Sequence, residues 1–144
     1  MRNETRTYAT PALGCLVGTA YQTMVRQLSA ELKKAGLDIS ASEYLVLRSL
    51  YYKNGSQQCE IAEMVGKDKA SVCRSVAGLE KKELVTTESL SYKCLRVYLT
   101  GKAREIEPRI MAVAESRHRA LTELATPDEI EAFTKVLRRI AETK

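Results

Sequence analysis

The sequence has few residues that break regular structure and no long hydrophobic run. Its 144 residues include only seven glycines and three prolines, which excludes collagen and disorder rich in these residues. No apolar stretch comes near the roughly 20 residues that a membrane-spanning helix needs. The N-terminus begins with polar residues, so we expect no secretory signal, no membrane partner and a cytoplasmic location. A single domain covering residues 1–144 is expected at this length.

Metal-binding and redox motifs are also missing. Cys15, Cys59, Cys73 and Cys94 form no Cys-x-x-Cys pair, and His118 is the only histidine. Zinc sites need clustered cysteine and histidine ligands, so we expect free thiols, no metal and no cofactor. A thiol enzyme built on Cys15 is an alternative, but a nucleophilic cysteine needs a nearby base and His118 lies far along the chain. We therefore predict no catalytic residue and no enzyme.

The excess of positive charge is concentrated in about a quarter of the chain. There are 23 lysines and arginines against 18 acidic residues, a net charge of +5. The segment 67–104 holds nine cations and four acids, and so accounts for the whole excess. Such a local field favours a polyanionic partner, with a solvated basic face as the alternative.

Apolar residues at helical spacing predict helices over most of the chain. A long first helix is expected to begin at a Thr10–Pro11 cap and to end near Gly36. The Ser40–Glu43 capping box opens a second helix. Residues of the capping type begin three more helices: Asp68, Thr100 and Thr126.

The middle of the sequence predicts a helix-turn-helix followed by a hairpin. A short helix over 58–65, a turn at Gly66 and a helix from Asp68 give the first part. Strands over 84–88 and 94–98, joined by the loop 89–93, give the second. The fold class is therefore mainly α with a small β-hairpin wing. The second helix is expected to expose a small, polar and basic face: Lys69, Ala70, Ser71, Arg74 and Ser75.

These residues resemble one family of regulators. The run Ile61–Val72, continued through Leu79–Val85, resembles the helix-turn-helix of the MarR family, the multiple antibiotic resistance regulators. Leu99–Thr100 resembles that family's step out of the wing. The resemblance implies a DNA-binding winged helix over about 56–99 and dimerisation helices over about 10–36 and 101–143. It further implies a homodimer that binds a pseudo-palindromic double-stranded DNA operator, usually as a repressor released by a small aromatic effector or by cysteine oxidation.

The sequence departs from the family pattern near the wing. Where the family typically carries Asp-x-Arg, this chain reads Ser91-Tyr92-Lys93, which keeps a charge but loses the planar guanidinium. The wing is also expected to be about two residues shorter than usual. Glu83 stands where a glycine commonly follows the recognition helix. A winged-helix module for protein contacts, without specific DNA binding, is therefore kept as the alternative.

The DNA-binding reading assigns roles to the exposed face. Lys69 and Ser71 would reach bases or phosphates, and Arg74 would recognise a guanine or contact phosphate. Ala70 would touch a thymine methyl group or serve only as a helix former. Two wing residues would contact phosphate or be solvated charges of the hairpin: Lys93 and Arg96.

Other residues are candidates for regulation. Tyr21, Tyr44 and Arg48 lie on helices that border the ligand pocket in the family, although tyrosines at such spacing are more often core residues. Cys15 lies where the family's organic hydroperoxide regulators place a reactive thiol, but its apolar surroundings favour a buried structural cysteine.

Overall fold

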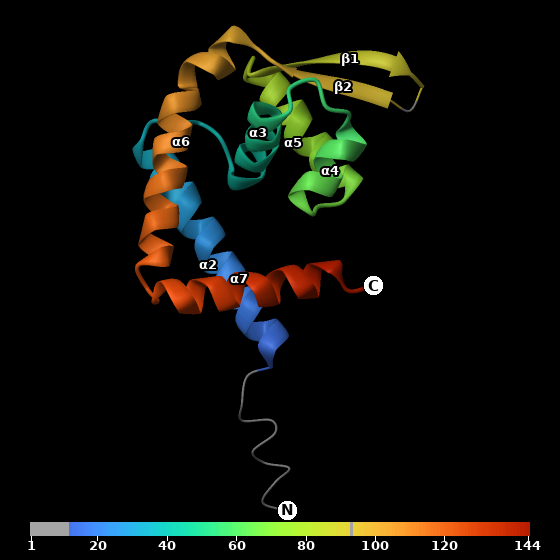
Figure 1. Ribbon diagram of the computed structural model, residues 1–144. Coiled ribbons are helices and arrows are strands. Elements are labelled where there is room, and N and C mark those ends of the chain that lie inside the picture. Colours follow the sequence, from blue (N-terminus) through green and yellow to red (C-terminus); the bar gives the residue numbers. More distant parts are fainter. Residues whose placement is uncertain (1–11, 93) are drawn as a thin grey trace, which may run out of the picture.

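The computed structural model describes residues 12–92 and 94–144, which form six helices and one two-stranded antiparallel sheet (Figure 1). The elements in chain order are α2 (Leu13–Lys34), α3 (Ala41–Tyr52), α4 (Gln58–Val65), α5 (Lys69–Lys81), β1 (Val85–Ser91), β2 (Cys94–Leu99), α6 (Gly101–Thr122) and α7 (Pro127–Glu142). None of the helices in this part of the chain is both long and apolar enough to cross a membrane.

Most of the predicted helix starts are confirmed. The Ser40 side chain accepts a hydrogen bond from the Glu43 amide at 3.1 Å, and the Glu43 carboxylate accepts one from the Ser40 amide, which completes the capping box of α3. Thr126 and Glu129 make the same reciprocal pair at the start of α7. Thr100 caps α6. Local side-chain chemistry therefore determines where these helices begin.

The first helix and the hairpin differ in detail from their predictions. Helix α2 begins at Leu13 after Ala12, which makes no side-chain cap, while the predicted Thr10–Pro11 cap lies outside the described residues. Strand β1 extends to Ser91, so most of the predicted loop 89–93 is strand. The pairing with β2 shifts register between Ser89 and Ser91. Such a shift places an extra residue on β1, as in a β-bulge.

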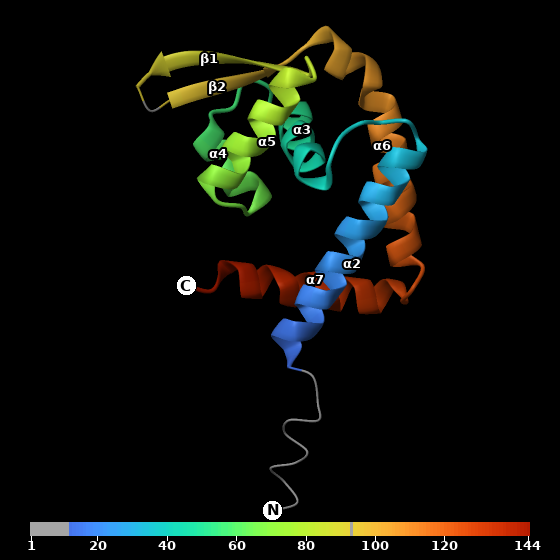
Figure 2. The same ribbon diagram turned by 180° about the vertical axis from the view of Figure 1, so that it is seen from behind.

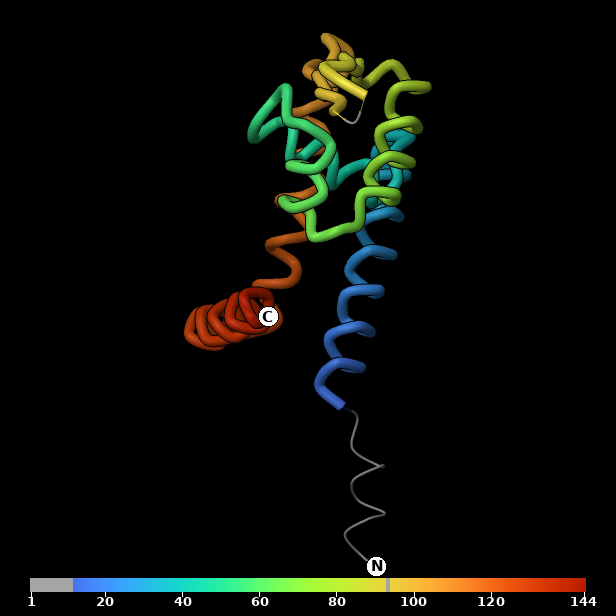
Figure 3. Tube along the Cα trace, turned by 90° about the vertical axis from the view of Figure 1, so that its right-hand side faces the viewer, coloured from blue at the N-terminus to red at the C-terminus, as the bar shows by residue number. Residues whose placement is uncertain are grey.

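The core lies between the winged helix and the upper part of α6. Its fully buried side chains come from every element except α7: Leu32, Leu47, Leu50, Ile61, Val72, Leu79, Val97 and Ile110 are among them. Helix α6 runs beside α2, and α7 leaves the lower end of α6, far from the hairpin (Figures 1 and 2). Figure 3 shows α7 nearly end-on, set apart from the helices of the winged helix. Helix α7 therefore contributes no buried residue to the core.

Candidate nucleic-acid interface and adjoining cavity

The two central helices, α4 and α5, are joined by a tight turn. Gly66 ends α4 with φ 67°, a left-handed conformation that suits glycine, and the Lys67 amide donates to the Ala62 carbonyl at 3.1 Å. Asp68 then caps α5, with its Oδ1 accepting from the Ser71 amide at 2.7 Å. The turn thus aims the N-terminus of α5 outward, with one of its free amides already satisfied by Asp68.

Helix α5 presents a basic face to solvent. Val72, Val76 and Leu79 are buried and hold the helix against α3 and α4. Lys69, Ala70 and Arg74 are exposed, and Ser71 is half-buried. Positions 70 and 74 are four residues apart and therefore share one face, while Lys69 is exposed at the N-terminus of the helix. A helix of this kind fits the major groove of duplex DNA.

Ser75 does not belong to that face, contrary to its prediction. Its residue is only 8% exposed. It stands next to Val76, three residues after Val72 and four before Leu79, so helical geometry turns it toward the core. A buried hydroxyl cannot reach a base edge or a phosphate.

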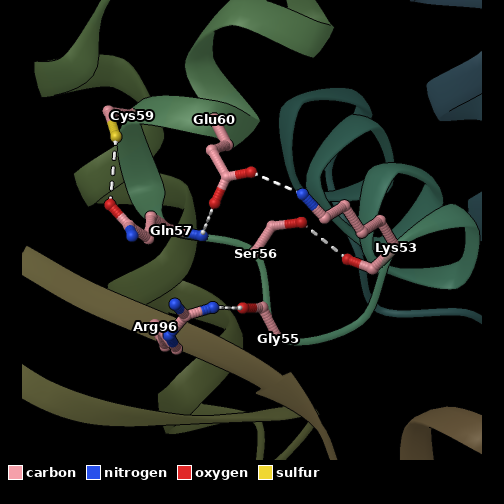
Figure 4. Close-up of polar contacts among 7 residues, drawn as sticks. All are labelled: Lys53, Gly55, Ser56, Gln57, Cys59, Glu60 and Arg96. Carbon is pink, nitrogen blue, oxygen red and sulfur yellow. Dashed lines mark hydrogen bonds and ion pairs between the residues drawn. The ribbon is translucent and has the colours of Figure 1, made fainter.

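Arg96 of the wing contacts the protein itself. Its Nη1 donates to the Gly55 carbonyl at 3.0 Å, and residue 96 also forms an isolated β-bridge with Gln57 (Figure 4). The α3–α4 connection is thereby attached to β2. Of the other wing residues, Lys93 lies outside the described residues, and the side chain of Tyr92 at the hairpin tip is almost fully exposed.

The start of α4 carries a second polar network beside this contact (Figure 4). Lys53 Nζ lies 2.6 Å from Glu60 Oε2, and the Gln57 amide donates to Glu60 Oε1 at 3.0 Å. The hydrogen bond from Lys53, followed by that from Gln57, lowers the pKa of Glu60 below its usual value. Glu60 therefore stays ionised and holds the α3–α4 loop in place.

A cavity of about 220 Å³ lies between α2, α3 and α6. Tyr21, Tyr44 and Arg48, which sequence reasoning singled out, all line it. Three further polar residues line it without any signal in the sequence: Gln27 of α2, and Arg117 and His118 of α6. The packing of α6 beside α2 brings them together, and Arg117 Nη2 donates to Gln27 Oε1 at 2.7 Å. The remaining walls are mainly apolar: Met24, Val25, Leu28, Ala41, Leu45, Ala114 and Leu121. Apolar walls with two arginines suit a small apolar acid.

All four cysteines are free thiols, and Cys15 is exposed in the single chain. The prediction of a buried Cys15 is therefore wrong in this structure, because residues 12–20 at the start of α2 are all exposed among the residues described. Cys59 is also exposed, while Cys73 Sγ lies 3.2 Å from Gln58 Oε1. Among residues 12–92 and 94–144, no group of three histidines, cysteines or acids could hold a metal ion.

A helix-turn-helix with a basic second helix, followed by a hairpin, is the winged-helix arrangement, which many DNA-binding proteins share. The model of the MarR family matches residues 39–90, which cover α3 to β1. The winged-helix segment of this chain is thus similar to the MarR family. No curated protein matches the sequence significantly.

Several solved structures share the fold over nearly the whole chain. The S. aureus MepR–DNA complex is 17% identical, with 92% of this chain and 97% of that chain covered and a TM-score of 0.81. BpsR of Bordetella bronchiseptica, described with regulation of DNA binding by 6-hydroxynicotinic acid, is 19% identical, with 92% and 95% covered and a TM-score of 0.81. The oxidised form of MarR from E. coli is 24% identical, with 92% and 96% covered and a TM-score of 0.71.

Proposed function

We propose that this regulator binds a pseudo-palindromic DNA operator as a homodimer and represses transcription until a small aromatic acid releases it. The observation that carries the proposal is the exposed basic face of α5 above a fully buried apolar face. In this proposal residues 56–99 form the DNA-binding part, and residues 10–36 and 101–143 form the dimer.

The dimer is supported by apolar faces that residues 12–92 and 94–144 leave exposed. On α7, Phe133, Val136 and Ile140 are 55%, 48% and 59% exposed. On the N-terminal half of α2, Leu13 and Leu16 are 79% and 50% exposed. Large contiguous apolar surfaces are rare on monomers, so a second copy of the chain is the partner that these helices suit.

On DNA, Arg74 would donate a pair of hydrogen bonds to a guanine, and Lys69 and Ser71 would contact phosphates or base edges. Ala70 would approach a thymine methyl group. Lys93 would add a phosphate contact from the wing. Arg96, which is bonded to Gly55, would hold the wing in place more than it contacts phosphate.

Selection of bound duplexes from a random pool tests the operator proposal. We expect enrichment of a two-fold symmetric site, bound with an affinity that falls with salt at a log–log slope of about −0.9 per phosphate neutralised. A pool without enrichment, combined with salt-independent binding, would favour a winged-helix module for protein contacts.

The effector proposal is supported by the cavity and by the acid in the description of BpsR. We expect 6-hydroxynicotinic acid or a related aromatic acid to weaken operator binding, and Arg48→Met to reduce that response. Lys34→Met, a change at a surface lysine whose side chain is 74% exposed, is the matched control. If the acids have no effect while peroxide releases DNA from the native protein and not from Cys15→Ser, then oxidation is the signal.

A further inference from the structure

The carboxylate of Glu43 lies between the start of α3 and the end of the recognition helix α5. Its Oε1 accepts hydrogen bonds from the Ser40 amide at 2.9 Å and from Lys82 Nζ at 2.7 Å. The residue is only 7% exposed, and Lys82 directly follows α5 as its C-cap. A buried carboxylate thus connects α3 to the end of α5, through two residues that are 39 positions apart in the sequence.

Gly78 provides the room for this carboxylate. A Cβ on residue 78 would stand 2.5 Å from Glu43 Oε2, closer than side chains ever approach. Glycine is among the least favourable residues inside a helix, and a buried carboxylate is costly unless it is paired. The glycine in the helix and the buried carboxylate therefore explain each other. Because Gly78 has no side chain, the Glu43 carboxylate can approach the backbone of α5.

Helix α3 also forms one wall of the cavity. Ala41, Tyr44, Leu45 and Arg48 line it, and Tyr44 is the neighbour of Glu43. Because α3 is a short helix of 12 residues with a capping box at its start, a ligand that moves Tyr44 also moves Glu43. The one element therefore contacts both the cavity and the end of α5.

We propose that the Glu43–Gly78–Lys82 contact transmits occupancy of the cavity to the recognition helix. The inference rests on the proposed function, since it needs operator binding and an effector cavity. A ligand shifts α3, the carboxylate presses on Gly78 or pulls Lys82, and α5 leaves the orientation that fits the operator. Glu43 and Lys82 are positioning residues, which couple the two sites without contact with DNA or effector.

A double-mutant cycle tests the coupling without a known effector. Ala114→Phe places a permanent aromatic ring in the cavity from α6, away from Glu43. In the native background we expect this substitution to weaken operator binding about 5- to 150-fold, the usual range of allosteric coupling. In the Glu43→Gln/Lys82→Met background, where the pair is replaced by groups of similar size, we expect a change of less than about twofold.

The controls separate this inference from the proposed function. Lys81→Met removes an exposed charge beside Lys82 and should leave the response to Ala114→Phe unchanged. An equal loss of affinity in both backgrounds, or no loss in the native one, would overturn the coupling while operator binding stands. If the native protein binds no operator, the proposed function fails. Amide hydrogen exchange in α5 then decides the coupling, because Ala114→Phe should speed it only where Glu43 and Lys82 are intact.

Discussion

Arg96 and Gly55 join the wing to the α3–α4 connection, through a hydrogen bond of 3.0 Å from Nη1 to the carbonyl oxygen. We expect Arg96→Ala to lower the free energy of unfolding by about 1–2 kcal/mol, because the half-buried carbonyl loses a charged donor. The salt dependence of operator binding should keep its slope. Chemical denaturation and a salt titration measure the two effects. A slope reduced by about 0.9 with unchanged stability would instead make Arg96 a phosphate contact.

Arg74 is expected to behave in the opposite way. Its side chain is exposed on α5, so Arg74→Ala should leave the free energy of unfolding unchanged. Operator binding should weaken by roughly 1–3 kcal/mol, with a relaxed preference at one base pair of each half-site. Titrations against the selected operator and a scrambled duplex measure this loss. Equal affinity before and after the substitution would contradict it. Lys34→Ala, at an exposed lysine that ends α2, serves as the control.

Glu83 adopts a left-handed backbone conformation with φ 61°, alone among the described residues other than glycine. A residue with a side chain is destabilised by about 1–2 kcal/mol in this conformation. Substitution by glycine removes this strain, but glycine also raises the entropy of the unfolded chain, which offsets part of the stabilisation. We therefore expect Glu83→Gly to raise the free energy of unfolding by about 0.5–1 kcal/mol. Lys81→Gly inside α5 should lower it by a similar amount, since φ is helical there. Urea denaturation of both variants decides whether the strain is present.

Tyr51 makes stability depend on alkaline pH. Its hydroxyl donates to the Ala103 carbonyl at 2.7 Å, and burial, followed by the charge of Glu107, raises its pKa from 10.0 to about 12. The folded state thus favours neutral Tyr51, and its stabilising contribution is fully present below pH 10 and is lost as the pH rises through about 12.

The comparison with Tyr51→Phe isolates this effect. At neutral pH the native protein should be more stable by about 0.5–1.5 kcal/mol, the usual net value of a hydrogen bond. The difference should shrink between pH 10 and 12. The tyrosinate absorbance of native protein minus variant should titrate near pH 12. A difference spectrum that titrates near pH 10 would show that Tyr51 is not held neutral.

Short-range signals in the sequence were sufficient for much of the fold. The capping box at Ser40, the αL turn at Gly66 and the cap at Asp68 each act within three or four residues, so helix boundaries could be predicted from neighbours alone. The same holds for the exposed faces of Lys69 and Arg74, because helical spacing from buried Val72 and Val76 places them outside. The same spacing places Ser75 on the buried side of α5. It was predicted to be exposed only because serine is polar.

Contacts between distant elements were decided only by the tertiary structure. Arg96 meets Gly55 across 41 residues, Lys82 meets Glu43 across 39, and Arg117 and His118 reach the cavity through the packing of α6 beside α2. Each of these contacts depends on the angle and the relative position at which two elements pack against each other. No local sequence pattern encodes that packing geometry. The sequence by itself determines which helix faces are apolar and where each helix begins. The partner of each polar side chain is determined only by how the helices and strands pack around the core.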